Sequence, residues 1–302
     1  MIPVPPLRRG DRVRIIAPSG PVPQDRFAAG LALLRARYEV TFDPDEVFAR
    51  EGFLAGPDEL RARGLNAALA DTSVQGVWMA RGGYGLMRLL RGIDWAVLRA
   101  HPKVLVGFSD GTALLAAAAS RGVASVHAPV VTQLSRLPTS DLDHLWALLE
   151  APREGILLSQ LARLCPGRVR GPLVGGNLEV FSRLLGTPYL PPLEGGILFL
   201  EEVGERPYRV DRLLTHLELA GVFDQVVGVV VGEFVGCDEP AGGPSPSVLN
   251  VLSERLRRFS FPVVLGGLFG HGERHLALPY GAEVELDATA GVLKFAQAAV
   301  VP

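Results

Sequence analysis

A serine stands where an apolar run changes abruptly into an alanine-rich stretch, in the segment VLVGFSDGTALLAAAAS at 104–120. Its neighbours complete the pattern G-x-S-x-G around Ser109, in which a sharp strand-to-helix turn exposes a nucleophilic hydroxyl. The helix N-terminus that follows offers free N–H groups, which could stabilise an oxyanion. The same residues also suit a plain tight turn, in which Ser109 or Asp110 only caps the helix. The pattern therefore indicates a candidate nucleophile that needs partners elsewhere in the chain.

A serine nucleophile needs a base, and one of the six histidines has a setting like that of the serine. His271 directly follows the apolar segment PVVLGGLFG and is flanked by Gly270 and Gly272. We therefore expect it at the carboxyl end of a strand, on backbone that allows close approach. His275 is the nearest rival, but it lies within the apolar segment HLALPYG. The alternative for His271 is a turn histidine without a chemical role.

Two glutamates that directly follow an apolar strand are candidates for the acid that orients the histidine. Glu201 and Glu202 come after GILFL, and a carboxylate that continues a buried run is costly unless it has a partner. Because side chains alternate along a strand, at most one of the two is expected to face the site. The alternative is a pair of solvated acids that bind the arginines nearby, namely Arg206, Arg209 or Arg212.

A glycine-rich loop, RGGYG at 81–85, is expected beside the end of the serine strand. Its glycines do not reproduce G-x-G-x-x-G, and no acidic residue stands out at the end of a second strand, so a dinucleotide site is disfavoured. A backbone N–H from Gly82 or Gly83 is a more economical contribution, as a second donor to an oxyanion.

Strand and helix patterns alternate through the first half of the chain, which favours a parallel sheet covered by helices on both faces. Active sites in such sheets lie at the carboxyl ends of the strands, where Ser109 and the RGGYG loop both fall. The predicted strands lie in RVRIIAPSG, VQGVWMARGG and KVLVGFSD, and the predicted helices lie in RFAAGLALLRARY, GLMRLLRGI and TALLAAAASRG.

The second half of the chain is predicted to form a separate domain. The segment at 150–170 mixes polar residues, prolines and glycines, as is typical of a domain link. We therefore predict an N-terminal α/β domain at 1–155 and a C-terminal domain at 165–302. The patterns of the second half are GILFLEEVGE, VVGVVVGEF and FPVVLGGLFGHG for strands, RPYRVDRLLTHLELAG for a helix, CDEPAGGPSPS for a long surface loop and AEVELDATAGVLKF for a hairpin.

The composition of the 302 residues describes a compact globular protein, with 48% hydrophobic and 21% charged residues. A net charge of −2 gives no electrostatic reason to expect nucleic acid as a partner. Cys165 and Cys237 have no CxxC neighbour, so no zinc site is indicated and a reducing compartment is expected. The sequence has no signal-peptide pattern and no apolar run of membrane-spanning length, so we expect a cytoplasmic protein without a membrane segment.

Five segments, in the same order, resemble the LD-carboxypeptidases, a serine peptidase family that also includes the microcin C self-immunity peptidases. The segments are ARGGYGLMRLL, VLVGFSDGTALL, GPLVGGNLEVFSRLLGTP, ILFLEEVGERPYRVDRLLTHLELAG and FGHGERHLALPYG. The resemblance runs from about Val13 to Val292, so it covers nearly the whole chain. Five collinear motifs are far more specific than G-x-S-x-G alone.

The resemblance implies a triad of Ser109, His271 and Glu201 that is shared between two domains. The implied fold is an N-terminal parallel α/β domain with a smaller C-terminal domain that contains a β-barrel-like sheet. The family usually has LED where this chain has LEE at 200–202. That change falls beside the implied acid, so the assignment of Glu201 stands.

The family resemblance also implies a substrate and the donors that bind its oxyanion. LD-carboxypeptidases cleave between the L-centre of a diamino acid and a terminal D-alanine in muropeptides, so a small peptide substrate is expected. The oxyanion donors would be the backbone N–H of Asp110 and one from Gly82 or Gly83. A carboxypeptidase also needs a group that binds the terminal carboxylate, and Arg81 is a candidate by position only. No cofactor and no metal are implied, and a homodimer is expected.

Three other functions stay open. An immunity-type peptidase on the same scaffold would cleave peptidyl-nucleotide antibiotics, and it would need an aromatic side chain to stack on the base. The sequence does not indicate which aromatic residue that is. A non-catalytic ligand-binding protein is disfavoured by the presence of all three triad residues. An unrelated α/β-hydrolase esterase is disfavoured because no HGGG-type loop is present and the serine strand comes only third or fourth in the chain.

Overall fold

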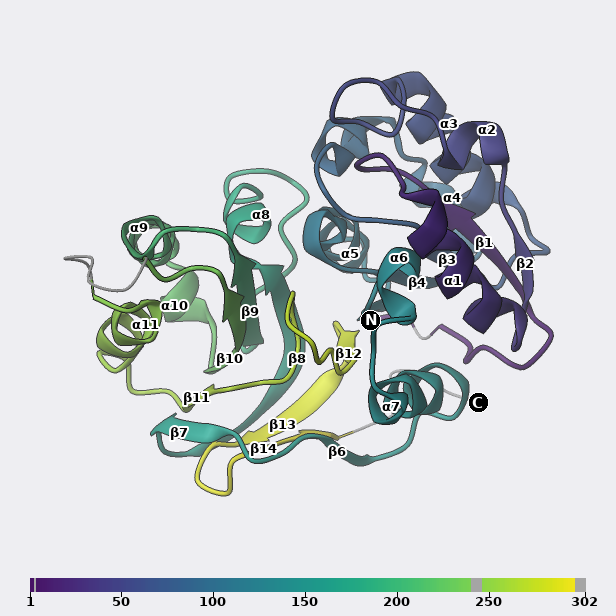
Figure 1. Ribbon diagram of the computed structural model, residues 1–302. Coiled ribbons are helices and arrows are strands. Elements are labelled where there is room, and N and C mark those ends of the chain that lie inside the picture. The colour runs from purple at the N-terminus through teal and green to yellow at the C-terminus, as the bar shows by residue number, and fades with distance from the viewer. Residues whose placement is uncertain (3, 240–245, 297–302) are drawn as a thin grey trace.

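The structure, a computed structural model, describes residues 1–2, 4–239 and 246–296 and consists of two α/β parts that pack side by side (Figure 1). Each part is built on one sheet, with six strands in the first part and eight in the second. Buried apolar residues of both parts form one continuous core. The predicted fold class, α/β with an N-terminal parallel sheet and a second sheet, is confirmed.

The first sheet is parallel apart from one edge strand. In spatial order its strands are β12 (Leu278–Tyr280), β5 (Ser125–His127), β4 (Val104–Gly107), β3 (Gly76–Met79), β1 (Arg12–Ile16) and β2 (Glu39–Thr41). Every residue of β3 and β4 is buried, as expected in the middle of a sheet with both faces covered. The carboxyl ends of these parallel strands meet at one edge, which is where the serine corner and the RGGYG loop begin.

Short helices connect the strands of the first sheet. They are α1 (Gln24–Arg35), α2 (Pro44–Val47), α3 (Asp58–Ala70), the 3₁₀ helix η1 (Leu86–Gly92), α4 (Trp95–Ala100), the 3₁₀ turn η2 (Ser109–Gly111), α5 (Thr112–Ala119), α6 (Val131–Leu134) and α7 (Thr139–Glu150). Helix α1 buries Phe27, Leu31 and Leu34, which recur at the spacing of one helix face. All eight residues of α5 are buried, because this helix lies between the two parts (Figure 1).

The second sheet is mixed, with four parallel strands in its middle. In spatial order its strands are β6 (Gly155–Leu158), β14 (Val292–Phe295), β13 (Glu283–Asp287), β8 (Arg168–Asn177), β9 (Ile197–Val203), β10 (Gly228–Val235), β11 (Val263–Leu265) and β7 (Ala162–Cys165). Strands β8 to β11 are parallel, and the strands on either side of them run antiparallel. The helices of this part are α8 (Leu178–Ser182), α9 (Pro207–Leu219), α10 (Val222–Gln225) and α11 (Val248–Leu256).

The predicted elements of both halves are found with one change of helix type. The segment GLMRLLRGI forms the 3₁₀ helix η1 between Gly85 and Ile93, and the backbone N–H of Leu86 is bound by a side chain from the serine corner. The predicted hairpin forms as β13 and β14. The predicted loop CDEPAGGPSPS lies partly at 240–245, outside the described residues.

One strand from the second half of the chain belongs to the first sheet. Strand β12 follows the His271 segment and pairs antiparallel with β5, with Leu278 opposite His127. The chain then returns to the second sheet as β13 (Figure 1). The domain boundaries at 155 and 165 stay predictions, and the structure adds that the first sheet is completed by residues far beyond them.

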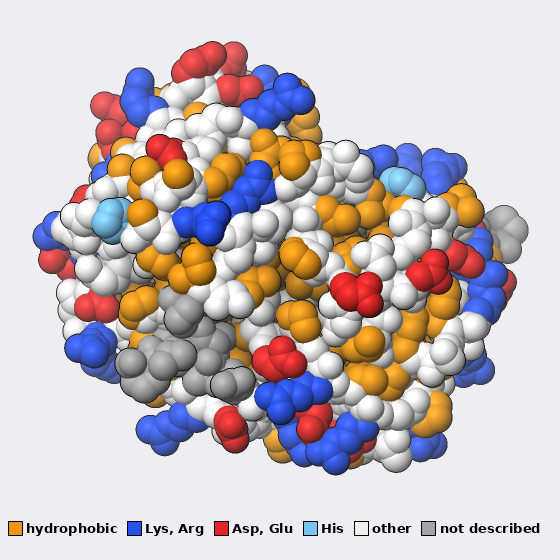
Figure 2. Space-filling view, turned by 180° about the vertical axis from the view of Figure 1, so that it is seen from behind, with side chains coloured by type: hydrophobic (Ala, Val, Ile, Leu, Met, Phe, Trp, Pro, Cys, Tyr) orange, Lys and Arg blue, Asp and Glu red, His pale blue; other side chains and the backbone are white. Residues whose placement is uncertain are grey.

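The surface carries charges of both signs. On the face seen in Figure 2, Lys and Arg side chains alternate with Asp and Glu side chains, and apolar side chains lie between them. Within the described residues, no helix is long and apolar enough to cross a membrane. No group of three or more His, Cys, Asp or Glu side chains is placed to hold a metal ion in the described part of the chain.

Candidate active site

The candidate nucleophile lies on a strained corner between β4 and α5. Ser109 has a φ of 63°, in the left-handed region that residues other than glycine seldom adopt. Backbone of this kind costs stability and is concentrated at functional sites. The flanking glycines are required by packing, since a Cβ on Gly107 or Gly111 would come within 2.7 Å of the Met79 sulfur. The corner thus places the serine hydroxyl at the carboxyl end of β4.

Two hydrogen bonds connect Ser109, His271 and Glu201 in a row. His271 Nε2 lies 3.1 Å from Ser109 Oγ, and His271 Nδ1 lies 2.7 Å from Glu201 Oε2. An ionised carboxylate can only accept a hydrogen bond, so Nδ1 carries the proton and Nε2 is left to accept from the serine hydroxyl. In this arrangement a histidine can remove the proton of a serine as the serine attacks a carbonyl. The structure therefore brings together the three side chains of the sequence prediction.

The carboxylate of this row is fully buried. Glu201 has 0% exposure, and 16% of the His271 side chain is exposed. A buried carboxylate beside an imidazole favours the charged imidazolium that forms when the ring takes a proton. Gly270 makes this contact possible, because its φ is 128° and a Cβ there would lie 3.0 Å from Glu201 Oε2. The glycine next to the histidine is thus explained by the approach of the acid.

The second glutamate of LEE points away from the histidine, as strand alternation predicts. Glu202 accepts hydrogen bonds from Asn177 Nδ2 at 2.9 Å, Glu179 N at 2.8 Å and Val203 N at 2.8 Å. Burial raises the pKa of Glu202 to about 7, although these three hydrogen bonds favour the ionised form. Glu202 therefore links β9 to the start of α8, and neither glutamate is the solvated acid of the alternative prediction.

The RGGYG loop lies directly against the candidate nucleophile. A Cβ on Gly82 would be 2.9 Å from Ser109 Cβ and 3.1 Å from Ser109 Oγ. The loop is held by a hydrogen bond of 3.0 Å from Gly20 N to Gly82 O. In the part of the chain that is described, the N–H groups of Gly82 and Gly83 have no acceptor. They are free to donate to a ligand, together with the N–H of Asp110 at the start of the helical turn.

We expect Gly82→Ala to lower kcat by at least about 100-fold, because a shift of roughly 1 Å in a reacting group can have an effect of that size. The added methyl group would meet the Ser109 side chain and displace its hydroxyl. The measurement is kcat for the peptide substrate, with the melting temperature as a check on folding.

Gly92→Ala is the matched control for this substitution. A Cβ on Gly92 meets nothing within 4 Å, so this variant should retain the kcat of the unchanged protein. A Gly82→Ala protein with full kcat would contradict the placement of the loop.

The carboxyl group of Asp110 connects the serine corner to the RGGYG loop. Its Oδ2 accepts a hydrogen bond of 2.9 Å from Leu86 N, the residue that follows the loop. Burial raises the pKa of Asp110, while this hydrogen bond acts in the opposite direction. The sequence suggested only a cap or a backbone donor at Asp110, whereas its side chain fixes the loop relative to Ser109.

Arg81, the candidate for binding the terminal carboxylate, is bonded to the protein's own backbone. Its guanidinium donates a hydrogen bond to the backbone oxygen of Pro21. Burial lowers the pKa of Arg81, and the neighbouring Arg26 acts in the same direction. The Arg81 guanidinium, which the sequence suggested for the terminal carboxylate, therefore holds the loop that follows β1.

A cluster of aromatic and imidazole rings packs around His271, and no motif in the sequence indicated it. Phe108 packs on His271 with ring centroids 4.4 Å apart, and it also contacts His275 at 4.7 Å and His127 at 5.6 Å. Burial lowers the pKa of His127 to about 3 and the pKa of His275 well below its usual value. Both rings therefore stay neutral and add no positive charge next to His271. The apolar segments around His127 and His275 were the available signal of burial.

The segment that carries His271 is anchored on helix α7. Arg274 donates two hydrogen bonds to Asp141 Oδ1, at 2.9 and 2.6 Å, and His275 N donates to Asp141 Oδ2 at 2.9 Å. Burial alone would raise the pKa of Asp141, but these bonds hold it below its usual range. The ion pair fixes the backbone next to His271 and occupies the guanidinium of Arg274.

Two family models match separate halves of the chain. The model of the LD-carboxypeptidase N-terminal domain matches residues 13–128, and that of the LD-carboxypeptidase C-terminal domain matches residues 170–286. The chain belongs to the LD-carboxypeptidase family. The protein is therefore a peptidase, a hydrolase that acts on peptide bonds, and the resemblance found in the sequence is confirmed.

Several known proteins and solved structures are similar to this chain over nearly its whole length. A putative carboxypeptidase of Synechocystis is 40% identical, with 96% of each chain covered. The murein tetrapeptide carboxypeptidase of Pseudomonas aeruginosa is 33% identical and covers 91% of this chain and 93% of its own. The crystal structure of muramoyltetrapeptide carboxypeptidase from Oxalobacter formigenes has a TM-score of 0.82 at 31% identity, with 94% and 97% covered. The microcin C7 self-immunity protein has the same fold, with a TM-score of 0.90 at 23% identity and 100% of both chains covered.

Proposed function

We propose that this LD-carboxypeptidase hydrolyses the bond between the L-centre of a diamino acid and a terminal D-alanine in murein tetrapeptides, as part of cell-wall recycling. The observation that carries the proposal is the hydrogen-bonded row of Ser109, His271 and Glu201. The substrate class is supported by the 33% identical relative whose name specifies murein tetrapeptides. No cofactor takes part in the proposed reaction.

The first half of the proposed reaction forms an acyl-enzyme on Ser109. Its Oγ attacks the scissile carbonyl while His271 Nε2 takes the hydroxyl proton. Glu201 keeps the ring in the Nδ1–H tautomer and stabilises the imidazolium. The oxyanion accepts hydrogen bonds from Asp110 N and from the Gly82–Gly83 loop. The C–N bond then breaks, and the imidazolium returns its proton to the nitrogen of the leaving D-alanine.

The second half of the proposed reaction releases the acyl group by the same route. His271 takes a proton from water as the water oxygen attacks the ester carbonyl. The tetrahedral intermediate is held by the same N–H donors, and the proton passes back to Ser109 Oγ as the ester bond breaks. The products are a tripeptide with a new carboxylate and the free serine. In both halves of the reaction His271 therefore acts first as a base, when it takes a proton, and then as an acid, when it returns the proton.

The test is the release of D-alanine from the tetrapeptide L-Ala-γ-D-Glu-diamino acid-D-Ala. The expected result is one D-alanine per tetrapeptide, with none from the tripeptide that lacks it. A pentapeptide that ends in D-Ala-D-Ala serves as a second control, because its terminal bond joins two D-centres. A protein that leaves the tetrapeptide intact would contradict the proposal.

An immunity-type peptidase is the second candidate function, and an exposed aromatic pair supports it. Phe53 and Tyr84 are 66% and 53% exposed, and their rings meet edge to face with centroids 5.6 Å apart. Tyr84 belongs to the RGGYG loop, so the pair stands next to the candidate oxyanion donors and offers a surface for a nucleobase. A peptide whose carboxy terminus is joined to a nucleoside sulfamate is the discriminating substrate. Turnover of that compound with an intact tetrapeptide would favour this second function.

The proposal includes two properties of the protein in the cell. We propose that it acts as a homodimer in the cytoplasm, where fragments of the recycled wall are available as small peptides. Sedimentation of the purified protein measures the first property, and the distribution of the protein between cell fractions measures the second.

A further inference from the structure

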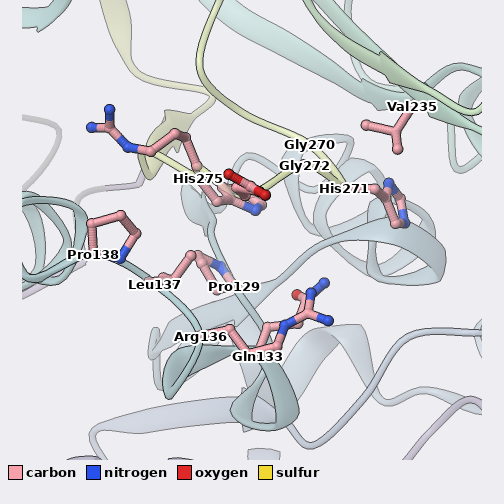
Figure 3. A pocket seen from close by; sticks show the side chains of 12 residues that line it. Pro129, Gln133, Arg136, Leu137, Pro138, Val235, Gly270, His271, Gly272 and His275 are labelled. Carbon is pink, nitrogen blue, oxygen red and sulfur yellow. The ribbon is translucent and has the colours of Figure 1, made fainter.

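A cavity of about 540 Å³ opens beside His271 (Figure 3). One wall comes from the second part of the chain, with Val235 and the segment from Gly270 to His275. The opposite wall comes from the first part, with Pro129 and the residues of α6 and just beyond it, among them Gln133 and Arg136. The cavity therefore lies between the two halves and shares its histidine with the candidate active site.

The chemistry of the proposed reaction decides which end of the substrate lies on this side. The proton that His271 takes from Ser109 must be given to the nitrogen of the leaving residue. The leaving residue therefore lies close to His271. The lining of the cavity includes His271 and excludes both Ser109 and the Gly82–Gly83 loop. It is thus the space next to the base, where the released D-residue and its carboxylate would lie.

The cavity lining contains two arginines, and Arg136 is the one without an anionic partner among the described residues. It is exposed, and in the described part of the chain its guanidinium forms no hydrogen bond and no ion pair. The other arginine of the lining, Arg274, is occupied by Asp141. In Figure 3 the Arg136 side chain extends into the cavity next to Gln133. The free fork of an arginine matches the two oxygens of a carboxylate.

Two polar atoms of the same lining also lack partners. Among the described residues, Gln133 Oε1 and His275 Nε2 are buried and have no hydrogen-bond partner, and His275 is 2% exposed. Buried polar groups in folded proteins are nearly always bonded to protein, water or a ligand. Both side chains border the cavity together with Arg136, so the wall around the free guanidinium is polar.

We propose that Arg136 binds the free carboxylate of the leaving D-residue and thereby restricts the enzyme to the last bond of a peptide. Arg81, the candidate from sequence position, is held by Pro21 and is absent from this lining. Arg136 lies beyond α6, which follows the strand β5 next to the serine strand β4. It is a specificity-determining residue that acts on substrate binding, and its assignment rests on the proposed carboxypeptidase function.

The test compares the tetrapeptide ending in D-alanine with the same peptide ending in D-alaninamide, whose terminus is neutral. The intact protein should prefer the acid in kcat/KM by about 10- to 100-fold, the range of a hydrogen bond to a charged group. Arg136→Ala should lose most of this preference, because its kcat/KM for the acid falls much further than its kcat/KM for the amide. Arg136→Lys should keep part of it.

Two further variants make the result specific. Arg99→Ala removes an exposed arginine of α4, outside the cavity lining, and should keep the full preference. Arg81→Ala should keep it too. An unchanged preference in Arg136→Ala, or an intact protein with no preference, would overturn the proposal while D-alanine release still supports the carboxypeptidase function.

A binding measurement separates this inference from the proposed function. Ser109→Ala protein is titrated calorimetrically with the acid and with the amide, with and without Arg136→Ala. Tighter binding of the acid than of the amide, lost in Arg136→Ala, supports carboxylate binding by Arg136 even where the intact protein releases no D-alanine. Equal binding of acid and amide by both proteins would overturn the proposal that Arg136 binds the carboxylate, whatever the outcome of the activity assay.

Discussion

Ser109→Ala is expected to lower kcat/KM for the tetrapeptide by about 10⁴-fold or more, the range found when a serine nucleophile is removed from a triad. The structure gives the reason, since Ser109 Oγ is the atom that faces His271 Nε2 at 3.1 Å. Alanine retains the Cβ at φ 63° and removes only the hydroxyl. The free energy of unfolding should therefore change by less than about 1 kcal/mol.

The measurement is the rate of D-alanine release, with urea denaturation as the check on stability. Ser260→Ala, at an exposed serine in the second half of the chain, is the matched control and should leave both quantities unchanged. Retention of more than a tenth of the activity in Ser109→Ala would remove the basis of the acyl-enzyme mechanism. A large loss of stability would instead show that the hydroxyl has a structural role at this corner.

Glu201→Gln should lower kcat by about 10³- to 10⁴-fold, whereas Glu202→Gln should lower it by less than about tenfold. Glutamine at 201 has nearly the same shape, but it carries no charge to stabilise the imidazolium. Its amide can also turn its NH₂ group toward His271 Nδ1 and favour the wrong tautomer. Glu202 contacts Asn177 and two backbone N–H groups, so its amide variant changes only the support of α8.

The pair of variants is its own control, because adjacent buried glutamates undergo the same chemical change. Single-turnover kinetics give the acylation rate of each variant, and thermal melting shows whether either has lost its fold. The reverse order of effects, with Glu202→Gln the more damaged, would assign the orienting acid to Glu202.

Each residue of the hydrogen-bonded row carried a local signal in the sequence. Ser109 lies between glycines at a strand-to-helix junction, Glu201 continues a buried strand, and His271 is flanked by glycines after another strand. Parallel strands of one sheet have their carboxyl ends at the same edge, which explains why Glu201, near the end of β9, and His271, after β11 of the same second sheet, lie close together. Ser109 follows β4 of the first sheet, so it meets them only because the two parts pack against each other. The local patterns could therefore predict the parallel sheet and the three candidate side chains, whereas the packing that joins them is a property of the whole fold.

The surroundings of that row had no comparable local signal. The bond from Leu86 N to Asp110, the packing of Phe108 on His271 and the place of Arg136 depend on how distant segments fold against each other. Arginine and aspartate occur on most surfaces, and no local pattern tells a free guanidinium from a paired one. For the same reason position alone favoured Arg81, which the structure shows bonded to Pro21.

Strand β12 makes the order of synthesis relevant to this enzyme. It pairs Leu278 with His127 and Tyr280 with Ser125, and it follows His271 by a few residues. A growing chain therefore cannot complete its first sheet until the base has also been made, and until then the edge of β5 stays unpaired. The strand that closes this edge then fixes the histidine segment against the serine corner. A chain truncated before residue 278 would therefore lack both a finished first sheet and the strand that positions the base.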